Sequence, residues 1–258
     1  MKRDLYFSKP IMNAAGSLGF APDPRNGIDL DSFGAFITNP ISLRSRLPAA
    51  QPALIEFPGG FLLHTGLPNP GLSSVLKKHG ARWNRADMPI IVNLMADRPE
   101  ETQQMVRSLE NIENVMAVEL GFAPLLSDDI ILLNLEMYVG ELPLIFSLPA
   151  EQVLSLGPKL IQGGAAAISI SSPRGALMNN NEMVTGRLYG RSLFPRALDI
   201  VRSAAMLEIP IIGASGVWTE KDAADMLLAG AMAVETDAQL WSPKEASAES
   251  ASHSNVIP

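Results

Sequence analysis

The sequence predicts a single (β/α)8 barrel, the TIM-barrel fold, on two observations. Eight short runs are almost continuously apolar, which is typical of strands covered by helices on both faces of a parallel sheet. Longer segments with the apolar spacing of helices separate most of these runs. The chain has 258 residues, a length typical of one such barrel. A doubly wound open sheet shows the same alternation, and strand counting alone leaves that alternative open.

The predicted strands often follow proline or glycine, the residues that mark turns from helix to strand. They span residues 11–15, 35–38, 89–94, 117–120, 143–148, 165–170, 210–214 and 231–236.

The predicted helices have identifiable ends. Segment 100–113 begins with acidic residues, which suit the positive end of a helix dipole, and segment 194–207 has a proline near its start. A third helix follows Thr219, an N-cap with an acid three residues later, and ends at Gly230. Segments 73–85 and 128–139 are also predicted to be helical. The barrel is therefore expected to occupy residues 1–241, and residues 242–258, rich in Ser, Ala and Glu, are predicted to form a disordered tail.

The composition excludes several classes of function. The net charge of −7 argues against a nucleic-acid-binding protein, which needs basic residues to neutralise phosphates. The chain has no cysteine, and its three histidines lie far apart in sequence, so no metal site is expected. The first residues lack the apolar run of a signal peptide, and no apolar run is long enough to span a membrane. We therefore expect a soluble cytoplasmic protein that binds a small-molecule ligand, with a homodimer as one option for its assembly.

Several glycine-rich motifs occur in a specific order along the chain. They are residues 12–16 (MNAAG), 34–38 with Arg46, the glycine loop 59–71, Val92-Asn93, Glu119-Leu120, Gly186 to Gly190 with Pro195, and 209–216. From Pro10 to Leu240 the chain resembles the dihydroorotate dehydrogenase family, whose members are FMN-dependent (β/α)8 barrels. The chain is shorter than typical members, and the missing residues are expected after the fourth strand and around residues 178–184.

This resemblance implies an FMN across the C-terminal mouth of the barrel. The ring would lie against Ala15-Gly16, and the phosphate would bind backbone amides after the last two strands, where glycine allows close approach to an anion. The implied FMN contacts are Ala15, Gly16, Asn39, Asn93, Ser147, Ser172, Gly213, Gly216, Val217, Asp237 and Ala238.

The chain departs from the family at the residues that carry the chemistry. Asn39 and Ser147 replace two lysines, so the cations that would stabilise a reduced flavin are absent. The region of the catalytic base reads Gly121-Phe122-Ala123-Pro124, and Asp237 would repel a phosphate that it faced. Dihydroorotate oxidation by the family mechanism is therefore not expected.

A few polar residues are candidates for replacement roles. His64, placed in the glycine loop, could act as an acid or base or lie on the surface. Tyr189 could donate a proton or fill an emptied pocket. Glu119 could face a ligand or form a structural ion pair, and Arg44 and Arg46 could hold an anion or lie on the surface.

Three functions remain open from the sequence. The first is an FMN-dependent oxidoreductase of the CH–CH type that acts on a small, less polar substrate, because Leu63, Gly121, Ala123 and Pro124 make the predicted mouth more apolar. The second is a catalytically inactive pseudoenzyme that serves as a binding or assembly subunit. The third is a barrel that binds a phosphorylated ligand without flavin, against which Asp237 argues.

Overall fold

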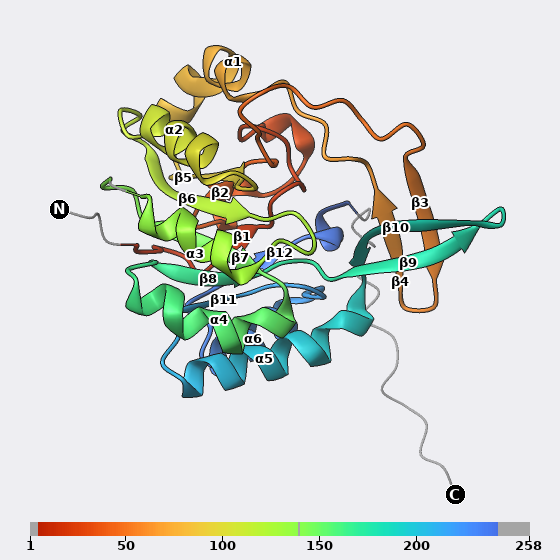
Figure 1. Cartoon of the computed structure of the whole chain (residues 1–258). Helices are drawn as coiled ribbons and strands as arrows, with labels where there is room; N and C mark the ends of the chain where they lie inside the picture. The colour runs from red at the N-terminus through yellow and green to blue at the C-terminus, as the bar shows by residue number, and fades with distance from the viewer. Residues whose placement is uncertain (1–4, 139, 242–258) are drawn as a thin grey trace, which may run out of the picture.

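The computed structural model describes residues 5–138 and 140–241, and their centre is a closed parallel barrel (Figure 1). Its strands are β1 (Ile11–Asn13), β2 (Phe36–Ile37), β5 (Ile90–Met95), β6 (Val115–Gly121), β7 (Leu144–Leu148), β8 (Ala167–Ile170), β11 (Ile211–Gly213) and β12 (Ala233–Thr236). They are hydrogen-bonded in the order β1-β12-β11-β8-β7-β6-β5-β2, and a parallel bridge from Met12 to Ala35, beside β2, closes the circle. All eight predicted strands are present, and the closure excludes the open-sheet alternative. The predicted tail, residues 242–258, lies outside the described residues.

In the part of the chain that the structure describes, six helices lie around the barrel. They are α1 (Leu72–Asn84), α2 (Pro99–Leu109), α3 (Asp128–Glu136), α4 (Ala150–Gln162), α5 (Phe194–Met206) and α6 (Glu220–Leu228), with short 3-10 turns η1 (Pro24–Asn26), η2 (Leu30–Ser32), η3 (Arg191–Leu193) and η4 (Ala238–Trp241). The five predicted helices are confirmed, and α6 begins with a capping box in which Thr219 and Asp222 bond each other's backbone amides. The sequence pattern did not identify α4, which contains Pro158, a residue that usually ends a helix. None of the helices in the described residues is long and apolar enough to cross a membrane.

A second, antiparallel sheet was not predicted. It consists of β3 (Ala53–Phe57), β4 (Gly60–His64), β9 (Arg174–Asn179) and β10 (Glu182–Tyr189), in the order β3-β4-β10-β9. Residues 60–64, predicted as part of a glycine loop, are therefore a strand, because β10 and β3 supply hydrogen-bond partners on both sides. Figure 1 shows this sheet beyond the ends of the barrel strands.

Apolar side chains fill the barrel near the N-terminal ends of its strands. A cluster of small and branched residues points inward from the strands: Met12, Ala35, Ile37, Ile91, Ala117, Ile145, Ala167, Ile212 and Ala233. A larger apolar cluster packs between the strands and the helices. The barrel is thus a packed core with no channel through it, and any ligand must bind at one end.

Candidate functional site

A polar layer lies directly above the apolar layer inside the barrel. Side chains alternate along a strand, so the residues two positions beyond the inward-facing apolar ones also point inward, nearer the C-terminal end. Those positions hold Asn93, Glu119, Ser147, Ser169 and Glu235, after Ile91, Ala117, Ile145, Ala167 and Ala233.

Glu119 is the centre of this layer. Its side chain accepts hydrogen bonds from the amide of Asn93 at 2.8 Å and the hydroxyl of Ser169 at 2.6 Å, and the residue is only 1% exposed. Glu119 therefore lies in a hydrogen-bonded network, and the amide of Asn93, predicted to contact FMN, is already used by Glu119.

Glu235 faces Glu119 across the barrel. Burial raises the pKa of Glu235 well above its ordinary value, and the neighbouring Glu119 carboxylate raises it further through charge repulsion and a hydrogen bond. The raised pKa favours the protonated form of Glu235, whose hydroxyl can donate to the Glu119 carboxylate. Of the two roles that the sequence left open for Glu119, facing a ligand or forming a structural ion pair, the ion pair is not formed within the described residues.

A cavity of about 290 Å³ opens between the polar layer and the antiparallel sheet. Its lining from the barrel includes Asn93, Met95, Asp97, Gly121, Phe122, Ala123 and Pro124, and its lining from the sheet and adjoining loops includes Leu63, His64, Thr65, Gly66, Leu67, Arg174, Arg187 and Tyr189, with Pro40 and Arg46 at its edge. The four positions predicted to make the mouth apolar thus lie at the cavity. His64 lies there as well, half-buried on β4.

The residues predicted to hold the flavin ring lie in loops after the first strands. Gly16 is exposed with a φ of 92°, and a Cβ there would have only the side chain of Pro40 within 4 Å, at 3.8 Å. Ala15 is half-buried against the inner apolar cluster. Asn39 accepts a hydrogen bond from the amide of Gly19 at 3.0 Å. Gly16 is thus exposed with little packed against it, but it does not line the mouth cavity, and the Asn39 side-chain oxygen is engaged within the protein.

The glycines predicted to bind phosphate make close internal contacts. A Cβ at Gly213 would lie 3.1 Å from the Sδ of Met226, and one at Gly216 would lie 2.4 Å from the backbone nitrogen of Phe194. Val217 is 1% exposed. Packing of the strand end against α6 and α5 therefore explains both glycines without a ligand.

Asp237 and Ala238 form the other half of the predicted phosphate site. The backbone amide of Ala238 donates to the side chain of Asp237, which is 4% exposed. Burial raises the pKa of Asp237 to about 6, against the opposing effect of backbone hydrogen bonds from Ala238 and its own amide. The amide available for a phosphate is thus bonded to a carboxylate of the chain itself.

The two predicted serines lie at the ends of β7 and β8. Ser147 is half-buried, and Ser172 forms a side-chain hydrogen bond with Tyr189. Tyr189 is 6% exposed, and burial raises its pKa. Its position inside the mouth fits the pocket-filling interpretation better than proton donation.

An aromatic cluster closes the mouth beside β1. Tyr189 stacks on Phe61 with ring centroids 5.4 Å apart, and Trp241 meets Tyr189 edge-on at 5.2 Å. The indole of Trp241 donates to the carbonyl oxygen of Ser17 at 2.9 Å. Neither Phe61 nor Trp241 was predicted to lie here. Phe61 meets Tyr189 because β4 pairs with β10, a pairing that the sequence analysis did not predict.

These residues do not fit FMN in the pose that the family resemblance implies. The two lysine positions carry no cation, the amide of Ala238 is occupied, and of the eleven predicted contacts only Asn93 lines the mouth cavity. The cavity instead has three arginines on its lining, Arg46, Arg174 and Arg187, and sequence reasoning missed Arg174.

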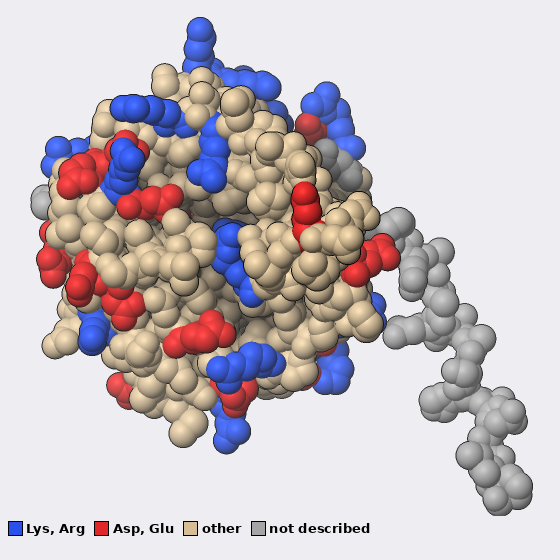
Figure 2. Space-filling view, turned by 45° about the vertical axis from the view of Figure 1, so that its right-hand side comes forward, with Lys and Arg blue, Asp and Glu red and all other residues tan. Residues whose placement is uncertain are grey.

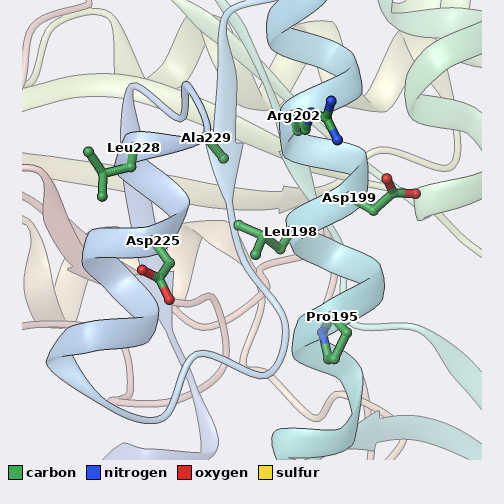
Figure 3. Close-up of a pocket in the computed structure, with 7 residues that line it drawn as sticks. All are labelled: Pro195, Leu198, Asp199, Arg202, Asp225, Leu228 and Ala229. Carbon is green, nitrogen blue, oxygen red and sulfur yellow. The ribbon is translucent and has the colours of Figure 1, made fainter.

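A second hollow of about 460 Å³ lies on the outer surface between α5 and α6. Figure 3 shows Leu198 of α5 and Asp225 of α6 projecting into the gap between the helices, whereas Asp199 points away. Asp225 is paired with Lys221 at 2.5 Å. This hollow lies away from the strand ends and brings together none of the predicted site residues.

Comparison with known proteins agrees with the fold. The dihydroorotate dehydrogenase family model matches residues 3–122 and 165–248. The catalytic subunit of dihydroorotate dehydrogenase B (NAD(+)) from Geotalea uraniireducens is 27% identical over 248 residues, covering 88% of this chain and 81% of that protein. The corresponding subunit from Pelobacter propionicus is 28% identical over 271 residues, covering 95% and 88%.

A crystal structure of the Eimeria tenella DHODH in complex with ferulenol has a similar fold, with a TM-score of 0.67 and 18% identity over 92% of this chain and 78% of that one. The segment that the family model leaves unmatched, 123–164, contains Ser147 and the end of the lost base motif. The match on either side of that segment covers most of the sequence, and the chain therefore belongs to the dihydroorotate dehydrogenase family.

Proposed function

We propose that this chain is a binding member of its family, a barrel that takes a small molecule into its mouth cavity and does not use FMN as an oxidoreductase would. The observation that carries this proposal is the carboxylate of Asp237 on the amide of Ala238.

The charge at this position opposes a flavin phosphate. With a pKa of about 6, Asp237 is mostly ionised at neutral pH. A phosphate at this position would meet a like charge in a buried environment, where charges are poorly screened, and would have to displace the carboxylate to reach the amide.

The chemistry of dihydroorotate oxidation is also unsupported. No lysine lies at positions 39 and 147, so a reduced flavin would lack its cation. The wall at Gly121, Ala123 and Pro124 offers no titratable group, and the nearby Asp97 accepts a hydrogen bond from the amide of Ala123 at 2.7 Å. A proton acceptor at the family position is missing, which removes a factor of roughly 10²–10⁴ in rate.

Flavin content tests this proposal directly. We expect the protein, purified from cells grown with added riboflavin, to be colourless and not to quench FMN fluorescence on titration. The matched variant is Ser147→Lys combined with Asp237→Gly, which restores a cation and frees the amide of Ala238, and it should quench FMN more than the parent. Stoichiometric FMN in the parent protein would overturn the proposal.

A second candidate is the FMN-dependent oxidoreductase acting on a small, less polar substrate. The exposed Gly16, with only the Pro40 side chain within 4 Å of a Cβ placed there, supports this alternative, as do the relatives that are dihydroorotate dehydrogenases. It requires a flavin held mainly by its ring. The same titration separates the two, because this alternative predicts bound flavin that the substrate reduces by two electrons and a separate electron acceptor reoxidises.

A further inference from the structure

We propose that the mouth cavity is a binding site for a small organic phosphomonoester, whose charged head group binds between Arg174 and Arg187. This inference rests on the proposed function, because it takes the ligand of the mouth to be something other than FMN.

The pairing of β9 with β10 brings the two arginines together. Arg174 and Arg187 are register partners in adjacent antiparallel strands, so their side chains leave the same face of the sheet, with Cβ atoms roughly 5 Å apart. Both line the cavity. Two like charges directly opposite each other destabilise a sheet unless an anion lies between them.

Within the described residues, no carboxylate supplies that anion. Among the ion pairs formed by residues 5–138 and 140–241, none within 4.0 Å involves Arg174, Arg187 or Arg46. Partial burial lowers the pKa of Arg174, and the charge of Arg187 lowers it further.

The distribution of charge favours a head group with two negative charges. Both guanidinium groups leave the same wall, and a phosphomonoester carries close to two charges at one point near neutral pH. A guanidinium can bond two oxygens of one phosphate at once. Figure 2 shows basic side chains in the hollowed centre of the face on the side of the antiparallel sheet.

The rest of the cavity sets the size and polarity of the ligand. Its volume of about 290 Å³ is at the lower end of the roughly 300–1,000 Å³ of ligand pockets, which suits a body of a few carbons. Leu63, Phe122 and Pro124 supply apolar contacts, and Asp97 lies on the barrel side of the lining. Asp97 repels a phosphate toward the arginines and can accept a hydrogen bond from a hydroxyl of the ligand.

Calorimetric titration of the FMN-free protein with glycerol 1-phosphate tests the site, with glycerol as the neutral comparison. We expect saturable binding of glycerol 1-phosphate and none of glycerol. Arg174→Gln and Arg187→Gln should each weaken binding about tenfold or more, because hydrogen bonds between charged groups are lost. Arg174→Lys should retain more affinity than Arg174→Gln. Arg107→Gln, an exposed arginine on α2, is the control and should leave binding unchanged.

Each other result overturns a defined part of the inference. Absent binding, or equal binding by the Arg→Gln variants in protein that melts like the parent, refutes the site. Glycerate, which has a carboxylate in place of the phosphate, should bind more weakly, and equal affinity refutes the assignment to phosphate. Bound FMN in the purified protein refutes the proposed function, whereas FMN-free protein that ignores glycerol 1-phosphate refutes only this inference.

Discussion

Replacing Asp237 by asparagine should stabilise this protein at neutral pH. Burial raises the pKa of Asp237 from 3.8 to about 6, so the native state binds the proton more tightly than the unfolded chain does. Between about pH 4 and pH 6 the native state therefore holds more protons, and the free energy of unfolding falls as the pH rises. A shift of about two units corresponds to about 3 kcal/mol, which is lost by pH 7. Asparagine keeps an oxygen for the amide of Ala238 but has no charge to bury.

Urea unfolding followed by tryptophan fluorescence measures the effect. The stability of Asp237→Asn relative to the parent should rise from near zero at pH 4 to about 3 kcal/mol at pH 7. Carboxyl groups far from Asp237 contribute equally to both proteins, whereas the loss of the Asp237 charge also lowers the pKa of Glu235, which that charge helps to raise. Asp87→Asn, at an exposed position, should show no such rise. A difference that is independent of pH, or a variant less stable than the parent at pH 7, would refute the argument that Asp237 is a buried, strained carboxylate.

Three further predictions address packing, the polar layer and activity. Gly190→Ala should lower the free energy of unfolding by about 3 kcal/mol or more, measured by thermal unfolding. Its φ is 144°, and the new Cβ would lie 2.2 Å from the backbone oxygen of Gly59. The comparison variant Gly19→Ala, whose Cβ would have nothing within 4 Å, should cost only about 1–2 kcal/mol. Glu119→Ala should cost about 3 kcal/mol in urea unfolding, since it leaves the buried donors of Asn93 and Ser169 without a partner. Dihydroorotate turnover by the FMN-supplemented protein should stay below ~1 s⁻¹, and an ordinary enzyme rate in a steady-state assay would contradict the argument from the missing lysines and base.

The barrel could be predicted because its strands are buried on both faces. Runs such as 143–148 and 165–170 are apolar at nearly every position, and no other common environment of a short segment requires that. The antiparallel sheet has no such pattern: β3 alternates between half-buried and exposed residues, and β9 is mostly exposed. One local signal was available, since Asn180-Asn181 connects β9 to β10 with positive φ at both residues, 49° and 67°, as in two-residue hairpin turns.

The candidate site was harder to predict than the fold. The positions of Asn93 and Glu119 followed from the ends of their strands, but their bond to each other depends on the register of β5 with β6. Arg174 and Arg187 lie thirteen positions apart in sequence, and only the pairing of β9 with β10 makes them neighbours. A sequence motif reports the residues at a site, whereas the partners that each residue finds depend on long-range pairing.

The polar groups of this barrel mouth are largely bonded to one another, and this bears on how the chain could dispense with a cofactor. The amide of Asn93 bonds Glu119, the side chain of Asn39 bonds Gly19, and the amide of Ala238 bonds Asp237. Buried polar groups that lose a ligand contact must find another partner or lose stability. Because the mouth supplies these partners internally, these groups have hydrogen-bond partners without a flavin, whereas Arg174 and Arg187 form no ion pair within 4.0 Å in the described part of the chain.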